Sequence, residues 1–81
     1  MFLDFNAVIV NLESMTKEEQ RDCLDEIEMN TDILLNYLED NLKLKEKAED
    51  VPATGMAVLH QQLTLAKAIK AWIADLKKSL L

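Results

Sequence analysis

Glycine and proline are almost absent from this chain. Its 81 residues include one glycine, Gly55, and one proline, Pro52, and these two lie three positions apart. Turns in sheet proteins rely on such residues, so their scarcity argues against a β-sheet fold. Aromatic residues make up only 5% of the chain, whereas hydrophobic residues make up 49%. This balance predicts a folded, all-α domain.

Cysteine and histidine are equally scarce. Cys23 is the only cysteine, so no intrachain disulfide can form, and we interpret it as a small buried hydrophobe. One cysteine and one histidine cannot make a zinc site within a single chain, and we expect no metal. The chain has no recognisable leader and no apolar run of 18 residues. We therefore expect a cytoplasmic protein that does not enter a membrane.

The sequence offers few groups for catalysis. His60 lies on the polar side of its expected helix, where a surface role is the commoner one. Cys23 and His60 could be imagined as nucleophile and base, but no glycine-rich turn is present to position them. With one glycine, no phosphate or dinucleotide loop can form. We expect no catalytic residue, no cofactor and no small-molecule substrate, and keep a small helical enzyme as a disfavoured alternative.

Acidic residues outnumber basic ones, and the net charge is −6. Residues 17–50 carry twelve acids and five bases, whereas residues 51–81 carry one acid and four bases. Phosphates would repel such a chain, so we expect no direct binding of nucleic acid. The run of seven acids between Glu18 and Asp32 leaves an alternative, an acidic inhibitor that imitates nucleic-acid charge on a basic partner protein.

Three segments have helical spacing. In residues 1–15, Phe2, Phe5, Ile9 and Leu12 share one face and Asp4 can cap, although the run from Val8 to Val10 would also suit a strand. Thr16 and Glu19 form a capping-box pattern, which predicts a long helix from there to about Glu49. The turn at residues 50–55 is followed by a helix over residues 56–80, with Pro52 at its first position or Thr54 as its cap.

Two long helices joined by a tight turn make an antiparallel hairpin. We expect one domain over residues 1–81, with the hairpin and a short N-terminal helix in a three-helix arrangement that dimerises into a larger bundle. The hairpin should bring Lys77 and Lys78 near Glu18, Glu19 and Asp22. In the last helix one broad apolar arc should form the core: Val58, Leu59, Leu63, Leu65, Ala66, Ile69, Trp72, Ile73, Leu76 and Leu80.

The central helix carries two apolar stripes rather than one. At roughly 100° per residue, a first arc forms the core face: Leu24, Ile27, Thr31, Leu34, Leu35, Leu38 and Leu42. A second set falls on the other side of the helix: Met29, Ile33, Tyr37, Leu44 and Ala48. Either the chain's own helices cover this second stripe, or another molecule does.

The second stripe predicts a function in association. We expect a non-catalytic helical module, such as an adaptor, chaperone or regulatory protein, that buries an apolar helix face on a partner protein or on a second copy. Trp72 is a candidate anchor, and the N-terminal phenylalanines offer a further contact. The expected interface residues are Met29, Ile33, Tyr37, Leu44, Trp72, Phe2 and Phe5.

Overall fold

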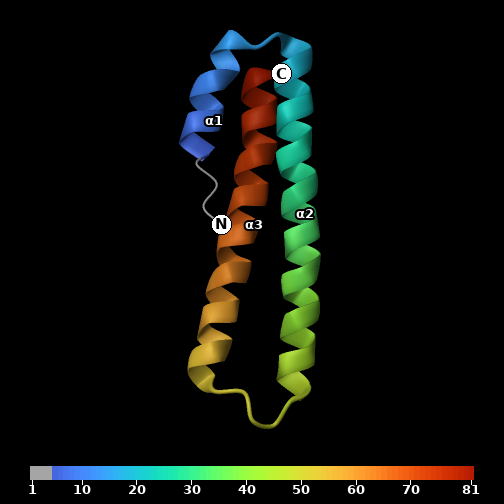
Figure 1. The fold of residues 1–81 in the computed structure, drawn as a ribbon, viewed down its shortest axis with the longest axis vertical. Coiled ribbons are helices and arrows are strands. Elements are labelled where there is room, and N and C mark those ends of the chain that lie inside the picture. Colours follow the sequence, from blue (N-terminus) through green and yellow to red (C-terminus); the bar gives the residue numbers. More distant parts are fainter. Residues whose placement is uncertain (1–4) are drawn as a thin grey trace.

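The structure is a computed structural model that describes residues 5–81, with side chains from residue 7 onward. A short helix α1 (Phe5–Asn11) runs into a single 3-10 turn η1 (Leu12–Ser14), and two long helices follow, α2 (Lys17–Lys47) and α3 (Ala53–Leu80). The long helices lie antiparallel, and α1 lies beside them at the end that holds the C-terminus (Figure 1). The predicted all-α hairpin is confirmed. Phe2, Asp4 and the side chain of Phe5 lie outside the described residues.

Helix α2 begins where the capping pattern predicts. The Glu19 backbone N–H donates to Thr16 Oγ1 at 3.2 Å, and the Thr16 N–H donates to Glu19 Oε1 at 3.1 Å. These two bonds satisfy donors that the first turn of a helix leaves unpaired. The helix ends at Lys47, two residues before the expected end, where Ala48 turns to extended geometry with φ −86° and ψ 137°.

Helix α3 begins earlier than expected. Its first residue is Ala53, and Pro52 precedes it as the N-cap with φ −62° and ψ 146°. Both predicted starts, Pro52 as the first helical residue and Thr54 as the cap, are therefore wrong. The ring fixes φ but leaves ψ free to be extended, which suits the cap position. Gly55 lies within the first turn of α3, and its φ is not positive, so the turn does not need its flexibility.

The N-terminal segment is helical where it is described. The expected helix over residues 1–15 is shorter, because α1 ends at Asn11 and the chain tightens into η1. Leu12 is 2% exposed and Ile9 packs against the same cluster, as their shared spacing predicts. The Gln20 side-chain amide donates to the Leu12 carbonyl at 2.7 Å, which ties η1 to α2.

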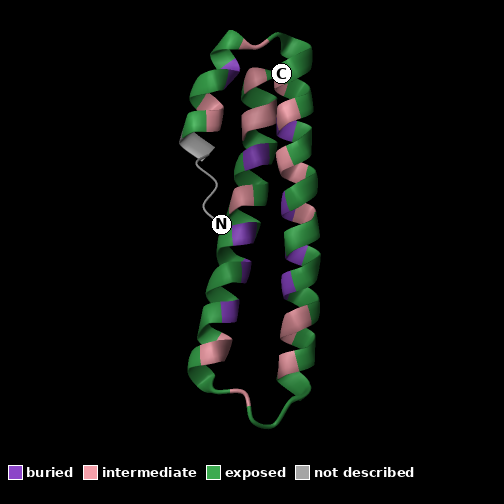
Figure 2. Ribbon diagram, in the orientation of Figure 1, coloured by how far each residue is buried: buried purple, intermediate pink, exposed green. Residues whose placement is uncertain are grey.

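The core consists of two clusters placed end to end along the hairpin (Figure 2). Near α1, three elements meet around Leu12, Leu24 and Ile73. Toward the turn, the described residues that form the core come from α2 and α3 alone: Leu35, Leu38, Leu59, Leu63 and Ala66. The molecule is therefore a three-helix assembly at one end and a two-helix hairpin at the other.

Ion pairs cross the hairpin between acids of α2 and lysines of α3. Lys77 pairs with Asp25 and also with Glu28, at 3.2 Å, and Lys70 pairs with Asp32 at 2.7 Å. The expected neighbours of Lys77 were Glu18, Glu19 and Asp22, which lie nearer the start of α2. The Lys77 side chain instead reaches Asp25 and Glu28, and at the end of the hairpin Lys17 donates to the Leu80 carbonyl at 2.6 Å.

Candidate protein-interaction surface

Four of the expected interface residues lie together on the side of α2 that faces away from α3. Met29 is 57% exposed, Ile33 61%, Tyr37 66% and Leu44 71%. We call this set the outer face of α2. Within the single chain no other described helix covers it, so the alternative of internal burial is excluded for the described residues. A stripe of four large side chains, each more than half exposed, is more than scattered surface hydrophobicity.

The position of the outer face follows from helical geometry. Helix α2 presents Leu24, Thr31, Leu35 and Leu38 to the core, and all four are buried. Residues two positions away from a buried one point roughly 200° around the helix, so Ile33 and Tyr37 must point to the opposite side. One neighbouring helix cannot cover both sides of α2, and α1 lies along a third.

Trp72 does not belong to the outer face of α2. It lies on α3, directly before the fully buried Ile73, and is 38% exposed. Trp72 therefore lies apart from the four residues of α2, because α3 packs on the opposite side of α2, and its role as an anchor stays a prediction. Phe2 lies outside the described residues, as does the side chain of Phe5, so neither is placed.

A second exposed apolar strip lies on α3. Val58 is 53% exposed and Leu65 is 56% exposed, although both were expected in the core, and Trp72 continues the same spacing of seven residues. Leu34 of α2 was also expected in the core and is 47% exposed. The described part of α1 packs on the cluster around Leu12 and leaves these three side chains exposed. The sequence contained a sign of this exposure, because the apolar arcs of the long helices are wider than one partner helix can bury.

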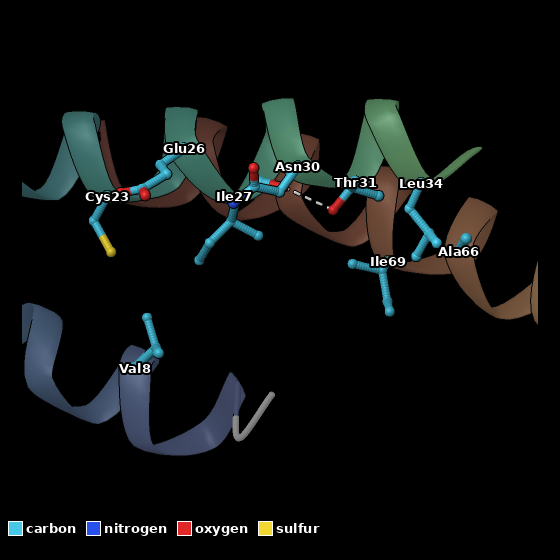
Figure 3. Close-up of a pocket in the computed structure, with 9 residues that line it drawn as sticks. All are labelled: Val8, Cys23, Glu26, Ile27, Asn30, Thr31, Leu34, Ala66 and Ile69. Carbon is cyan, nitrogen blue, oxygen red and sulfur yellow. Dashed lines mark hydrogen bonds between the residues drawn. The ribbon is translucent and has the colours of Figure 1, made fainter. Parts of the chain in front are cut away.

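A cavity of about 310 Å³ lies between α1 and the long helices (Figure 3). Val8 faces it from α1, and Cys23, Ile27 and Leu34 face it from α2. Its remaining lining residues are Glu26, Asn30, Thr31, Ala66 and Ile69. The Thr31 hydroxyl donates to the Ile27 carbonyl at 2.7 Å and so needs no further partner. Cys23 is half-buried here, rather than fully buried as expected.

The groups considered for catalysis do not converge. Cys23 packs against the core cluster at the α1 end, whereas His60 is exposed and follows Leu59 of the cluster at the turn end. Within residues described by the structure, no three His, Cys, Asp or Glu side chains gather in a way that could hold a metal ion. In the same part of the chain, no helix carries an apolar stretch long enough to cross a bilayer.

Comparisons of this sequence and structure with protein families, curated proteins and solved structures find no match.

Proposed function

We propose that this protein is a non-catalytic protein-protein interaction module that acts by burying the outer face of α2 on a partner protein or on a second copy. The observation that carries the proposal is the exposure of Met29, Ile33, Tyr37 and Leu44, 57% to 71%, along one side of one helix. The half-buried thiol of Cys23 fits a reducing compartment such as the cytoplasm.

The free energy available on this face is substantial for so small a protein. Burying the exposed remainder of each of the four side chains contributes about 1 kcal/mol. A small domain is stable by only about 5 to 15 kcal/mol in total, so leaving this surface in water forgoes a sizeable gain. Association also buries apolar surface of the partner, so the total gain is about twice as large, and it exceeds the lower range of the association cost, about 4 kcal/mol, by a few kcal/mol. Association through this face is therefore expected to be reversible.

The chemistry of the four side chains suits a contact surface. The thioether of Met29 adapts its shape to a partner, and Tyr37 combines an apolar ring with a hydroxyl that can remain hydrated or bond a polar group. Both residue types are enriched at protein interfaces. Ile33 and Leu44 add aliphatic area on either side of Tyr37.

A second candidate function is inhibition of a basic partner protein by the acidic end of α2. Glu18, Asp22 and Glu26 are exposed at intervals of four residues, and they extend the outer face toward the start of the helix. Three further acids of this run, Asp25, Glu28 and Asp32, are paired with lysines of α3. The acids that remain for a basic partner are those on the outer side. Binding of this kind would weaken steeply with added salt.

Matched variants test the proposed surface. Ile33→Glu places a charge within the outer face, whereas Leu65→Glu places one on an exposed apolar position of α3. We expect Ile33→Glu to abolish association, measured by chromatography of the pure protein and by capture from the native cell, and Leu65→Glu to preserve it. If both variants associate exactly as the wild type does, the outer face of α2 is not the contact surface. The double variant Asp22→Lys/Glu26→Lys tests the acidic candidate, which requires it to lose all binding.

A further inference from the structure

Side chains along the outer face of α2 are spaced for helix pairing. From Asn30 to Lys47, three apolar residues, Ile33, Tyr37 and Leu44, share this side of the helix with three polar or charged ones, Asn30, Asp40 and Lys47, at alternating steps of three and four, and Met29 lies beside the first of them. All six are exposed. Such spacing, an average of 3.5 residues, keeps one side of a helix against another helix over several turns. The partner that this pattern fits is a helix of similar length.

We infer that the partner is a second copy of this chain, whose α2 docks antiparallel on the outer face of α2. This inference rests on the proposed function and names the partner for it. In an antiparallel pair, a residue that follows a step of three on one helix lies opposite a residue that follows a step of four on the other. One register then places Ile33 opposite the second copy's Leu44 and Tyr37 opposite its Asp40, and Asn30 opposite its Lys47. A two-fold axis generates the same contacts in reverse.

Each contact in this register is chemically complementary. Ile33 and Leu44 bury aliphatic area on each other at two places. The Tyr37 hydroxyl can donate to the Asp40 carboxylate, and the Asn30 side-chain carbonyl can accept from the Lys47 ammonium. Apolar residues therefore meet apolar residues, and each charge meets a group that can bond to it.

Parallel pairing of the same face is unfavourable. It would place Asp40 opposite Asp40 and Lys47 opposite Lys47, and Glu26 opposite Glu26 one step further along. Like charges directly opposite each other are repulsive, and this repulsion selects the antiparallel arrangement. Asn30, at the edge of the outer face, also lines the cavity beneath α1, whereas Ile33, Tyr37 and Leu44 do not. The ion pairs at Asp25 and Asp32 join α3, and Cys23 and Ile27 pack in the cluster beneath α1.

Sedimentation equilibrium of the purified full chain tests the second copy as partner. We expect reversible dimers for the wild type and for Leu65→Glu, and monomers for Ile33→Glu over the same concentrations. A wild type that stays monomeric up to millimolar concentration would overturn the inference, as would a dimer abolished by Leu65→Glu and retained by Ile33→Glu. In the monomeric case, capture of a different protein that depends on Ile33 would still support the proposed function, so the two failures are distinguishable.

Charges at position 30 test the antiparallel register. Asn30→Glu should pair with Lys47 and tighten the dimer about threefold to tenfold, and Asn30→Lys should weaken it by a similar factor. The double variant Asn30→Lys/Lys47→Glu should restore the dimer. In a parallel dimer, both single variants would place like charges opposite each other and both would weaken association, which would overturn the register. Thermal unfolding at low concentration controls for changes in the isolated hairpin.

Discussion

Leu24 of α2 and Ile73 of α3 pack in the same core cluster, and neither side chain has any exposed surface. They mark the part of the hairpin that η1 also covers, through Leu12. We expect Leu24→Ala to lower the free energy of unfolding by about 2 to 5 kcal/mol, because the change leaves a cavity in a closed site. Urea unfolding at low protein concentration measures this loss.

Leu44→Ala is the matched control for that measurement. Leu44 belongs to the same helix and is 71% exposed, so the isolated chain should lose less than about 0.5 kcal/mol. At high concentration the same variant should unfold at lower urea than the wild type, because it also weakens association. Equal losses for the two variants in the dilute protein would show that the outer face is already buried within one chain.

The capping box at the start of α2 makes the stability dependent on acid pH. The Thr16 backbone N–H, which donates to the Glu19 carboxylate, lowers the pKa of Glu19 below its ordinary value. A lowered pKa stabilises the fold above the unfolded pKa, about 4.3, and this contribution is lost as pH falls through the folded pKa. Glu19→Gln keeps the hydrogen bond without the charge, so we expect a smaller loss of stability from about pH 5 to about pH 3, a range that includes that unfolded pKa.

The effect of the cap itself is measured with Thr16→Ala. Loss of the Thr16 hydroxyl leaves the Glu19 N–H without its acceptor, and the expected cost is about 1 kcal/mol at neutral pH. Ser14 also donates to a backbone carbonyl, that of Asn11, but lies outside the cap of α2 and is exposed. Ser14→Ala is therefore the control. A cost at Thr16 no larger than at Ser14 would contradict the role of the capping box.

Lys77 of α3 forms ion pairs with Asp25 and Glu28 of α2, and these pairs join the two helices of the hairpin. The hydrogen bond that the Lys77 ammonium donates to the Asp25 carboxylate, with a further one to Glu28, raises the pKa of Lys77. A raised pKa stabilises the fold below the unfolded pKa of lysine, and this contribution is lost as pH rises through the folded pKa. We expect Lys77→Met to lower stability by less than about 1 kcal/mol, and the loss to shrink in high salt. Lys78→Met, at an exposed neighbouring position, should leave stability unchanged.

Gly55 offers a stabilising substitution. It lies in the first turn of α3 without a positive φ, and a Cβ there would meet only Val51 Cγ1, at an ordinary 3.9 Å. Alanine has the higher helix propensity and restricts the unfolded chain, so Gly55→Ala should raise the free energy of unfolding by about 0.5 to 1 kcal/mol. A thermal melt checks the sign. A lower melting temperature would show that the turn before α3 needs the freedom of glycine.

The hairpin could be predicted from the sequence because its signals are local. The capping box at Thr16 and Glu19 placed the start of α2, and the lack of other turn residues placed the reversal between the two long helices near Pro52. The start of α3 at Ala53 was missed, because φ of proline suits a cap as well as a first helical position.

The surface was predicted in part. The positions opposite the core of α2 follow from the period of a helix, and Met29, Ile33, Tyr37 and Leu44 are exposed together. The exposure of Val58, Leu65 and Leu34 could not be predicted, because the apolar period does not show which part of a wide apolar arc the neighbouring helices cover. By its helical spacing Trp72 could belong either to the expected core arc of α3 or to the exposed strip of α3. Only the packing of α3 decides between a core and a surface position.

Hydroxyl-radical footprinting of Tyr37 tests the central claim most directly. In the dilute chain Tyr37 is 66% exposed and should be modified readily, with the half-covered Trp72 as an internal reference. We predict that modification of Tyr37 falls several-fold relative to Trp72 as the protein is concentrated or placed in extract of its native cell, and that Ile33→Glu abolishes this protection. If Tyr37 remains as reactive as in the dilute chain under every one of these conditions, the outer face of α2 is not an association surface.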